Sequence, residues 1–253
     1  MPVAGLAAGG PRGRELTAMS AEQRRARADH GHPCFARFYA WAGPLMDRGG
    51  LAAHRAELLA GLTGAVIEVG AGSGLSFGHY PAAVTGVVAV EPERRLRSAA
   101  VAAAKRARVA VYVVGGVAER LPAADESFDA AVACLVLCTV ADARAAVSEL
   151  ARVVRPGGQL RFFEHVAASG PGASRVQKLL DASVWPHMFG GCHLSRDTMT
   201  TVGAAGFTVS RLDQVRYPDT RLAPLFIPHI RGVGRRFPSP RKAVTDDGSV
   251  DRG

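Results

Sequence analysis

Short apolar runs alternate with amphipathic segments along most of this chain. The runs predict buried strands over residues 65–69, 87–90, 109–114, 130–138, 159–163 and 207–212. Segments whose apolar residues fall three and four positions apart predict helices over residues 93–107, 142–155 and 195–205. Strands alternating with helices of this length indicate an α/β fold: a doubly wound, mostly parallel sheet with helices on both faces.

Polar and helix-breaking residues predict where several of these elements begin and end. Asp142 can cap the helix over 142–155, and Pro156-Gly157-Gly158 should stop it. Residues 177–189 are expected to be helical up to Pro186, and Ser195 to be the N-cap of the helix that follows. Residues 214–230 contain a last extended piece, and the sheet is expected to include an antiparallel edge strand.

One wound domain with two tails is the expected organisation. We expect a disordered basic segment over residues 1–30, the domain over 31–230, and a disordered tail over 231–253. Residues 31–62 should form two helices at the start of the domain. Phe35, Phe38 and Tyr39 recur at helical spacing, so this piece should bury an apolar face, either as a lid over the ligand site or as plain core.

The net charge of +9 raises two possible partners, nucleic acid and an anionic membrane. However, 28 of the 31 basic residues are arginines spread over the whole chain. Two local concentrations, within residues 12–27 and 231–242, fall in the expected tails and are interpreted as solvated. We therefore expect no nucleic-acid partner and keep a peripheral contact with an anionic membrane open. No apolar run reaches 18 residues and no signal-peptide pattern is present, so a cytoplasmic, or membrane-peripheral, location is expected.

The four cysteines, at positions 34, 134, 138 and 192, show no close paired spacing. Structural zinc sites usually draw their ligands from such pairs. The sequence therefore predicts no metal, and it predicts no disulfide framework.

The most informative segment is a strand that runs into three alternating glycines. It reads Glu68-x-Gly70-x-Gly72-x-Gly74, and the next strand ends about 20 residues later on Glu91. Glycines let the backbone turn sharply and approach a ligand, while an acid at the tip of the next strand can accept hydrogen bonds from ribose hydroxyls. A dinucleotide fingerprint has the spacing G-x-G-x-x-G, which this segment lacks, so the glycine spacing disfavours a nicotinamide cofactor. Its resemblance to the first motif of class I methyltransferases implies S-adenosylmethionine (SAM) instead.

The same segment resembles the first motif of class I SAM-dependent methyltransferases, which have a Rossmann-like fold. Further segments resemble the methyltransferases of ubiquinone and menaquinone biosynthesis: 118–122, 127–129 and 150–158. A closer resemblance, to the alkyl thiol ("methyltransferase-like") subgroup and its bacterial relatives, is carried by residues 135–140, 163–166, 185–189, 191–196 and 228–230. The resemblance implies methyl transfer from SAM to a small apolar acceptor such as an alkyl thiol, with S-adenosylhomocysteine as product.

The resemblance also implies a set of SAM-binding residues. Those expected around the methionine and ribose are Glu68, Gly70, Ala71, Gly72, Ser73, Gly74, Glu91 and Pro92. Ala118 and Glu119 are expected near the adenine, and Cys134 and Leu135 near the sulfonium.

Two histidines are the candidate bases for an acceptor thiol. His165 follows the strand over 159–163 and His193 lies in a later loop. Ligands bind at the carboxyl ends of strands in open α/β sheets, which is why these two are preferred. Other acceptors remain open: a phospholipid amine, a quinone precursor or a natural-product hydroxyl. A nucleic-acid-binding module is a remoter alternative, because the residues at 134–138 are apolar.

Overall fold

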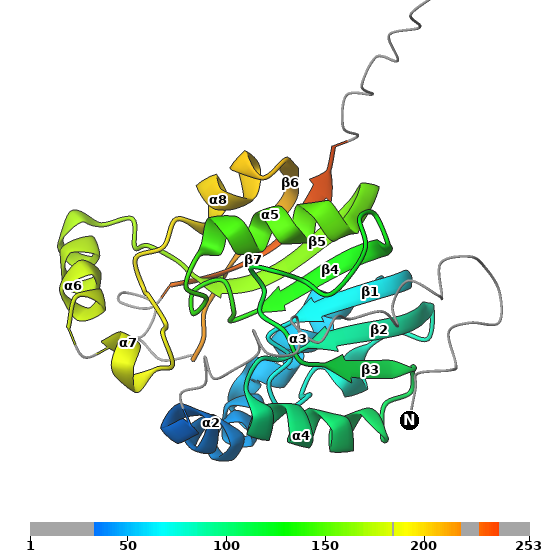
Figure 1. The fold of residues 1–253 in the computed structure, drawn as a ribbon. Coiled ribbons are helices and arrows are strands. Elements are labelled where there is room, and N and C mark those ends of the chain that lie inside the picture. Colours follow the sequence, from blue (N-terminus) through cyan, green and yellow to red (C-terminus); the bar gives the residue numbers. More distant parts are fainter. Residues whose placement is uncertain (1–32, 184, 219–227, 238–253) are drawn as a thin grey trace, which may run out of the picture.

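The computed structural model describes residues 33–183, 185–218 and 228–237, and within them it contains a seven-stranded sheet of order β3-β2-β1-β4-β5-β7-β6 (Figure 1). The first five strands are parallel, and β7 and β6 add two antiparallel strands at one edge. The predicted fold class is thereby confirmed. The strands are β1 (Gly64–Val69), β2 (Val84–Val90), β3 (Val111–Val114), β4 (Phe128–Cys134), β5 (Val154–His165), β6 (Phe207–Val215) and β7 (His229–Arg236).

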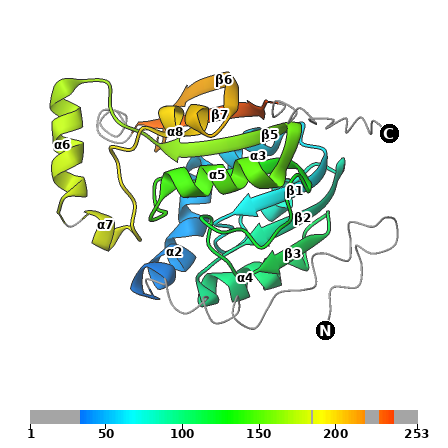
Figure 2. The ribbon, with the colours of Figure 1, turned by 45° about the horizontal axis from the view of Figure 1, so that its top comes forward.

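Helices cover both faces of this sheet (Figure 1 and Figure 2). Helix α5 (Ala143–Val153) packs on β5 and on α8 (Thr198–Ala204), while α3 (Ala52–Leu59) also contacts β5, from the opposite face. The remaining helices are α2 (Pro33–Met46), η3 (Asp47–Leu51), η4 (Phe77–His79), α4 (Arg94–Ala104), α6 (Pro171–Asp181) and α7 (Trp185–Met188).

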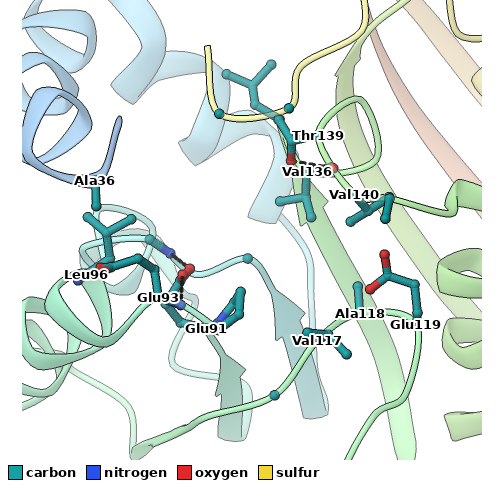
Figure 3. Close-up of a pocket in the computed structure, with 18 of the residues that line it drawn as sticks. Ala36, Glu91, Glu93, Leu96, Val117, Ala118, Glu119, Val136, Thr139 and Val140 are labelled. Carbon is teal, nitrogen blue, oxygen red and sulfur yellow. Dashed lines mark hydrogen bonds between the residues drawn. The ribbon is translucent and has the colours of Figure 1, made fainter. Parts of the chain in front are cut away.

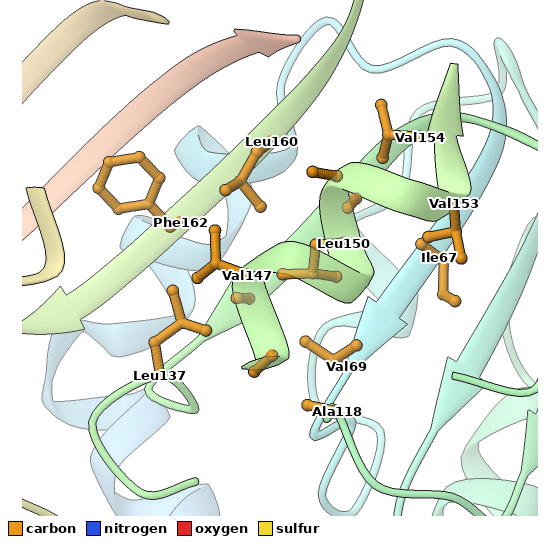
Figure 4. Packing of buried hydrophobic residues seen from close by; sticks show 14 of the residues in the cluster. Ile67, Val69, Ala118, Leu137, Val147, Leu150, Val153, Val154, Leu160 and Phe162 are labelled. Atoms are coloured by element: carbon orange, nitrogen blue, oxygen red, sulfur yellow. The ribbon is translucent and has the colours of Figure 1, made fainter. Parts of the chain in front are cut away.

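Successive side chains of β1 contribute to the hydrophobic core on opposite faces of the sheet. Ile67 belongs to the same buried cluster as Leu150 of α5 and Phe162 (Figure 4), whereas the preceding Val66 belongs to a second cluster with Leu58 of α3. Successive side chains of a strand point to opposite faces, so a strand that is apolar at every position must be covered on both sides. The central strands are covered by helices on both faces, which explains the continuous apolar runs in the sequence.

The apolar run over 130–138 is only partly a strand, which corrects the prediction. Strand β4 ends at Cys134, and Leu135 adopts a positive φ of 59°, so the chain leaves the sheet there. A second boundary also differs: α5 ends at Val153, and β5 already begins at Val154, before the Pro156-Gly157-Gly158 segment expected to separate them. The ladder between β4 and β5 shifts register at this point, which accommodates the extra residues as a bulge.

Three helix predictions also need correction. The strand and glycine turn over residues 65–74 also predict a helix directly after them, but the chain there forms turns and the short 3₁₀ helix η4. The helix expected over 177–189 is two helices, α6 from Pro171 and α7, with Pro186 inside the second. Helix α8 starts at Thr198 with Asp197 as its N-cap, because the expected cap Ser195 instead donates to Asp181.

The last strand extends past the expected end of the domain at residue 230. Strand β7 runs to Arg236, so residues 231–236 belong to the sheet. A Cβ on Gly232 would lie 2.1 Å from Phe162 Cζ, so glycine is needed for β7 to lie against that ring. Arg231, expected in a solvated tail, pairs with Asp213 at 3.2 Å. The predicted tail over 1–30 and the rest of the 231–253 segment, from residue 238, lie outside the described residues.

The expected apolar face of the first helix is not buried as one unit. Tyr39 is half-buried and contacts Arg55, but Phe38 keeps 47% of its surface exposed. Neighbouring residues point about 100° apart around a helix, so burying Tyr39 turns Phe38 outward. The side chain of Phe35 lies outside the described part of the structure.

Candidate active site

A cavity of about 650 Å³ opens at the carboxyl ends of β1, β2 and β4, where the strand order reverses. Ligand sites of open α/β sheets form at this kind of switch point. Figure 3 shows Glu91 and Glu93 on one side of the cavity and Val136, Thr139 and Val140 across from them. The lining residues are Ala36, Tyr39, Gly70, Gly72, Glu91, Pro92, Glu93, Leu96, Gly116, Val117, Ala118, Glu119, Arg120, Cys134, Leu135, Val136, Thr139, Val140, Ala141, Gly190, Gly191 and His193.

The glycine segment after β1 brings bare backbone to the cavity. Gly70 has a φ of 60°, and a Cβ on it would lie 2.4 Å from Val136 Cγ2. Gly72 has a φ of 57°, and its Cβ would lie 3.1 Å from Tyr39 Cε1. Both the left-handed conformation and the lack of space therefore require glycine, and the result is a cradle in which a ligand can contact the main chain.

Glu91, at the end of β2, is held by the backbone on both sides. Its Oε2 accepts from Gly72 N at 2.8 Å and its Oε1 from Glu93 N at 2.9 Å (Figure 3). Burial raises the pKa of this carboxyl, and the two backbone donors oppose that rise. Its fixed oxygens, beside the glycine cradle, can accept from two adjacent hydroxyls, so the residues present fit the ribose of a nucleoside.

Eight of the twelve predicted SAM-binding residues line the cavity. They are Gly70, Gly72, Glu91, Pro92, Ala118, Glu119, Cys134 and Leu135. Ala71, Ser73 and Gly74 are not among the lining residues. A Cβ on Gly74 would lie 2.7 Å from Phe77 Cε2, so this third glycine allows close packing beneath the turn.

Glu68 lies below the cavity instead of in its wall. It is 2% exposed, and its Oε2 accepts from the Tyr80 hydroxyl at 2.9 Å. Burial raises the pKa of the Glu68 carboxyl. In this structure Glu68 therefore braces the chain after β1 against η4 and its neighbours.

Arg55 of α3 is a buried cation behind the cavity wall that sequence reasoning missed. It is 4% exposed and pairs with Asp47 at 3.1 Å. It also donates to the Tyr39 hydroxyl at 3.3 Å and contacts Cys134 Sγ at 3.4 Å. Burial raises the pKa of Cys134 to about 11, with the Arg55 charge acting in the opposite direction. This thiol is therefore neutral near pH 7 and packs beside the cavity as a small apolar group.

Glu164 shapes the loop that follows β4. It is fully buried, and its carboxylate accepts from Val136 N and Leu137 N at 3.0 Å and from Cys138 N at 3.2 Å. Burial raises the pKa of the Glu164 carboxyl against these donors. The Glu164 carboxylate thus satisfies three backbone N–H groups that lie beyond the end of the sheet. The chain can therefore turn at Leu135 and place apolar side chains in the cavity wall.

A later segment, 190–196, closes the same side of the cavity. His193 N donates to Cys138 O at 2.8 Å, and Arg196 donates to Leu137 O at 2.9 Å. Gly191 has a φ of 88° and lies against Thr139 O. Glu164 and Arg196 both fall within segments that resemble the alkyl thiol subgroup, yet nothing in the linear pattern indicated that they support one loop.

The two candidate bases lie in different places. His193 lines the cavity and is half-buried. His165, at the end of β5, is not among the lining residues; its Nδ1 lies 3.3 Å from Cys192 Sγ, and its ring lies 4.3 Å from that of His229. Of the two candidate bases, only His193 is thus among the residues that line this cavity.

A glycine cradle after β1, a fixed carboxylate at the tip of β2 and an apolar loop after β4 surround one cavity, and this arrangement fits a nucleoside. A family model described as a methyltransferase domain matches residues 67–162. Mouse (Mus musculus) thiol S-methyltransferase TMT1B is 34% identical over 171 residues, which cover 66% of this chain and 69% of that protein. The chain belongs to this family of SAM-dependent methyltransferases, and SAM is its cofactor.

Two further similarities concern the fold and one part of the sequence. A crystal structure of an S-adenosylmethionine-dependent methyltransferase from Mesorhizobium loti shares the fold, with a TM-score of 0.56 and 16% identity over 73% of this chain and 96% of that chain. A demethylmenaquinone methyltransferase from Beutenbergia cavernae is 39% identical over 99 residues, which cover 39% of this chain and 40% of that protein. Among the described residues, no helix has both the length and the apolar character needed to cross a bilayer.

Proposed function

We propose that this methyltransferase acts on a small apolar thiol. The observation that carries the proposal is the side of the cavity across from Glu91, where the apolar side chains of Val136 and Val140 lie beside the hydroxyl of Thr139 (Figure 3). Leu135 and one imidazole, His193, also line the cavity. Such a wall suits an alkyl chain, and the imidazole suits a group that must lose a proton. The similarity to thiol S-methyltransferases, which extends over about two thirds of both chains, supports the same acceptor.

Glu91 and the glycine cradle orient the cofactor in this proposal. The Glu91 carboxylate accepts from the ribose hydroxyls, and the backbone around Gly72 faces the methionine part. Ala118 and Glu119 lie on the adenine side. Bound there, SAM supplies a methyl group on a positively charged sulfur. The apolar side chains of the β4 loop exclude water from the line along which the acceptor approaches.

His193 removes the proton from the acceptor. A cysteine thiol has a pKa near 8.5, and a simple alkyl thiol is a weaker acid still, so only a small fraction of the acceptor is thiolate at neutral pH. His193 takes the thiol proton, and the sulfur lone pair forms the new carbon–sulfur bond while the bond from the methyl carbon to the sulfonium breaks. The products are a methyl thioether and neutral S-adenosylhomocysteine, and the proton leaves from the imidazolium.

A matched set of acceptors tests the substrate class. The purified protein is given SAM with hexanethiol, hexanol or hexylamine, and S-adenosylhomocysteine is quantified by mass spectrometry. We expect product with the thiol at a rate at least ten times that with the other two. Equal rates with the alcohol or the amine would contradict a thiol preference. Product only with a quinol or a phospholipid amine would redirect the assignment to the other acceptors considered for this chain.

The pH dependence of the rate tests the base. His193→Ala should lower kcat/KM at pH 7 by roughly 100-fold, the ordinary size of general-base catalysis. The deficit should shrink as the pH approaches the pKa of the thiol, because the acceptor then ionises without help. His187→Ala is the matched control, since His187 is an exposed histidine that does not line the cavity. Parallel pH profiles for wild type and His193→Ala would exclude this role.

A further inference from the structure

A second cluster of reactive side chains lies behind the cavity wall. The sulfurs of Cys138 and Cys192 and a ring nitrogen of His165 all lie within 4.8 Å of one another. Cys138 is fully buried, Cys192 is 4% exposed, and His165 is half-buried. The methyl-transfer chemistry described above uses none of these three groups.

Three separate segments bring these residues together. Cys138 lies in the loop after β4, His165 is the last residue of β5, and Cys192 lies in the segment after α7. His165 and Cys192 are 27 residues apart along the chain, and the two cysteines are not close in sequence either. The linear pattern therefore did not reveal the cluster. Because β4 and β5 are parallel neighbours, the residues beyond their carboxyl ends lie side by side.

The donor set and its dimensions suit a zinc ion. Thiolate sulfur and imidazole nitrogen are the ligands that Zn²⁺ prefers, at about 2.3 Å and 2.0–2.1 Å. Tetrahedral coordination at these lengths puts ligand atoms about 3.5–3.8 Å apart. The distance from Cys192 Sγ to His165 Nδ1 is 3.3 Å. The other distances between ligand atoms are at most 4.8 Å, so these atoms need to move only a little closer to bind one ion.

The surroundings of the cluster also suit a buried cation. On one side Cys138 and Cys192 pack with Leu194, and the stacked rings of Trp185 and Phe189, 4.1 Å apart, lie against them. On the other side is the buried carboxylate of Glu164, which accepts from the backbone of Cys138. A dry shell strengthens the attraction between a cation and its anionic neighbours.

We propose that Cys138, His165 and Cys192 bind one Zn²⁺ ion, which fastens the β4 loop to the 190–193 segment. Both of these segments supply lining residues of the cavity: Val136, Thr139 and Val140 from the first, Gly190, Gly191 and His193 from the second. The ion would therefore hold the acceptor side of the cavity in shape. Three protein ligands leave a tetrahedral ion one position for water or another small ligand. This proposal does not depend on the identity of the methyl acceptor.

Metal content and a cobalt spectrum test the site directly. The full chain is produced in zinc-supplemented medium, purified under reducing conditions without chelator, and analysed by inductively coupled plasma mass spectrometry. We expect about one zinc per chain. Protein produced with Co²⁺ should show the visible bands of tetrahedral cobalt together with a thiolate charge-transfer band in the near ultraviolet.

Two variants and a matched control complete the design. The double variant Cys138→Ser/Cys192→Ser should contain no zinc and show no cobalt bands. His165→Asn, at a half-buried position, should weaken the metal content without removing both thiolates, and serves if the double variant fails to fold. Cys134→Ser is the control: it removes a buried thiol at the end of β4, outside the cluster, and must retain the metal and the bands.

Three results would overturn the proposal. One is a folded wild-type protein without zinc that stays colourless with Co²⁺. A second is a set of cobalt bands that survives in the double variant. A third is a disulfide between Cys138 and Cys192, found by peptide mass spectrometry, in a protein that takes up no metal even after reduction.

Discussion

Replacing Glu91 by glutamine tests the contact proposed for the ribose of SAM. In the structure both carboxylate oxygens already accept a backbone N–H, one from Gly72 and one from Glu93. Glutamine has nearly the same shape but offers one oxygen and one NH₂ group. One backbone donor then faces another donor, and one ribose hydroxyl loses an anionic acceptor.

The size of the effect follows from these contacts. A hydrogen bond to a charged group contributes about 1.5–3 kcal/mol. Losing one such bond to the ligand raises Kd roughly 10- to 150-fold, since each 1.4 kcal/mol is a factor of ten. We therefore expect the Kd of Glu91→Gln for SAM to rise by one to two orders of magnitude.

Isothermal titration calorimetry with SAM measures this change. Glu93→Gln is the matched control, because Glu93 lines the same cavity and carries the same charge, but its carboxylate accepts from Leu96 N at the start of α4. Its Kd should stay within about threefold of wild type, as expected when only a solvent-screened charge changes. If Glu91→Gln bound SAM as tightly as Glu93→Gln, the assignment of Glu91 to the ribose would be refuted.

The pH dependence of SAM binding gives an independent check on the same residue. Burial raises the pKa of Glu91 above its ordinary 4.5, so the carboxyl takes up a proton at a higher pH than an exposed glutamate. Affinity should therefore weaken as the pH falls through this raised value, already above pH 4.5. Glu91→Gln cannot take up that proton, and its Kd should lose this pH dependence. An unchanged slope in the variant would contradict the explanation.

Three further predictions concern the frame around the site, each measured as the free energy of unfolding in urea. Gly70→Ala should cost roughly 2–4 kcal/mol, because φ is 60° and a Cβ would lie 2.4 Å from a valine methyl, whereas the control Gly157→Ala, with a φ of 78° but open space, should cost only about 1–2 kcal/mol. If Gly70→Ala and Gly157→Ala lowered the free energy of unfolding equally, the steric clash predicted at Gly70 would be contradicted. Arg55→Met should cost about 2–3 kcal/mol, less than for a fully buried pair because Asp47 keeps 16% exposure, and adding Asp47→Asn should recover part of it. Glu164→Gln should cost about 1–3 kcal/mol, since one of three buried backbone donors loses its acceptor; no measurable loss would show that the loop does not need this carboxylate.

The parts of the fold that the sequence predicted are those with a local physical cause. The apolar run around Ile67 must be covered on both faces, so it could only be a central strand. Gly70 and Gly72 indicated a sharp turn with open backbone, and the structure has positive φ at both. Glu91 ends the next strand, as an acid must to reach the same edge of a parallel sheet. At these residues the local sequence pattern predicts the position that the folded structure shows.

The corrections arise where distant partners decide the structure. The apolar run over 130–138 has no local signal for a turn at Leu135, because the acceptor for the freed backbone donors is Glu164, in the next strand. Ser195 is a good cap by composition, but Asp181 competes for its hydroxyl. Single-sequence patterns do not contain these long-range hydrogen bonds.

The predictions for the candidate site also divide into those with a local cause in the sequence and those that depend on distant contacts. Eight of the residues expected to bind SAM line the cavity, whereas Glu68 and His165 are not among the lining residues, and the sequence pattern does not distinguish the two groups. Gly116, Gly190 and Gly191 also line the cavity but carry no signal in the sequence that indicated it. Arg55 was missed because a single arginine in a helix usually lies on a solvated face. Only the fold shows that its guanidinium reaches both Tyr39 and Cys134.

The central claim is that this chain methylates a thiol with SAM bound at Glu91, and product analysis tests it most directly. Purified protein is incubated with SAM carrying a trideuterated methyl group and with hexanethiol, and both products are quantified by mass spectrometry. The account predicts equal amounts of S-adenosylhomocysteine and trideuteromethyl hexyl thioether, with much less of both from Glu91→Gln at the same subsaturating SAM concentration. Tight SAM binding without either product would contradict the thiol acceptor, and equal product from wild type and Glu91→Gln would contradict the site.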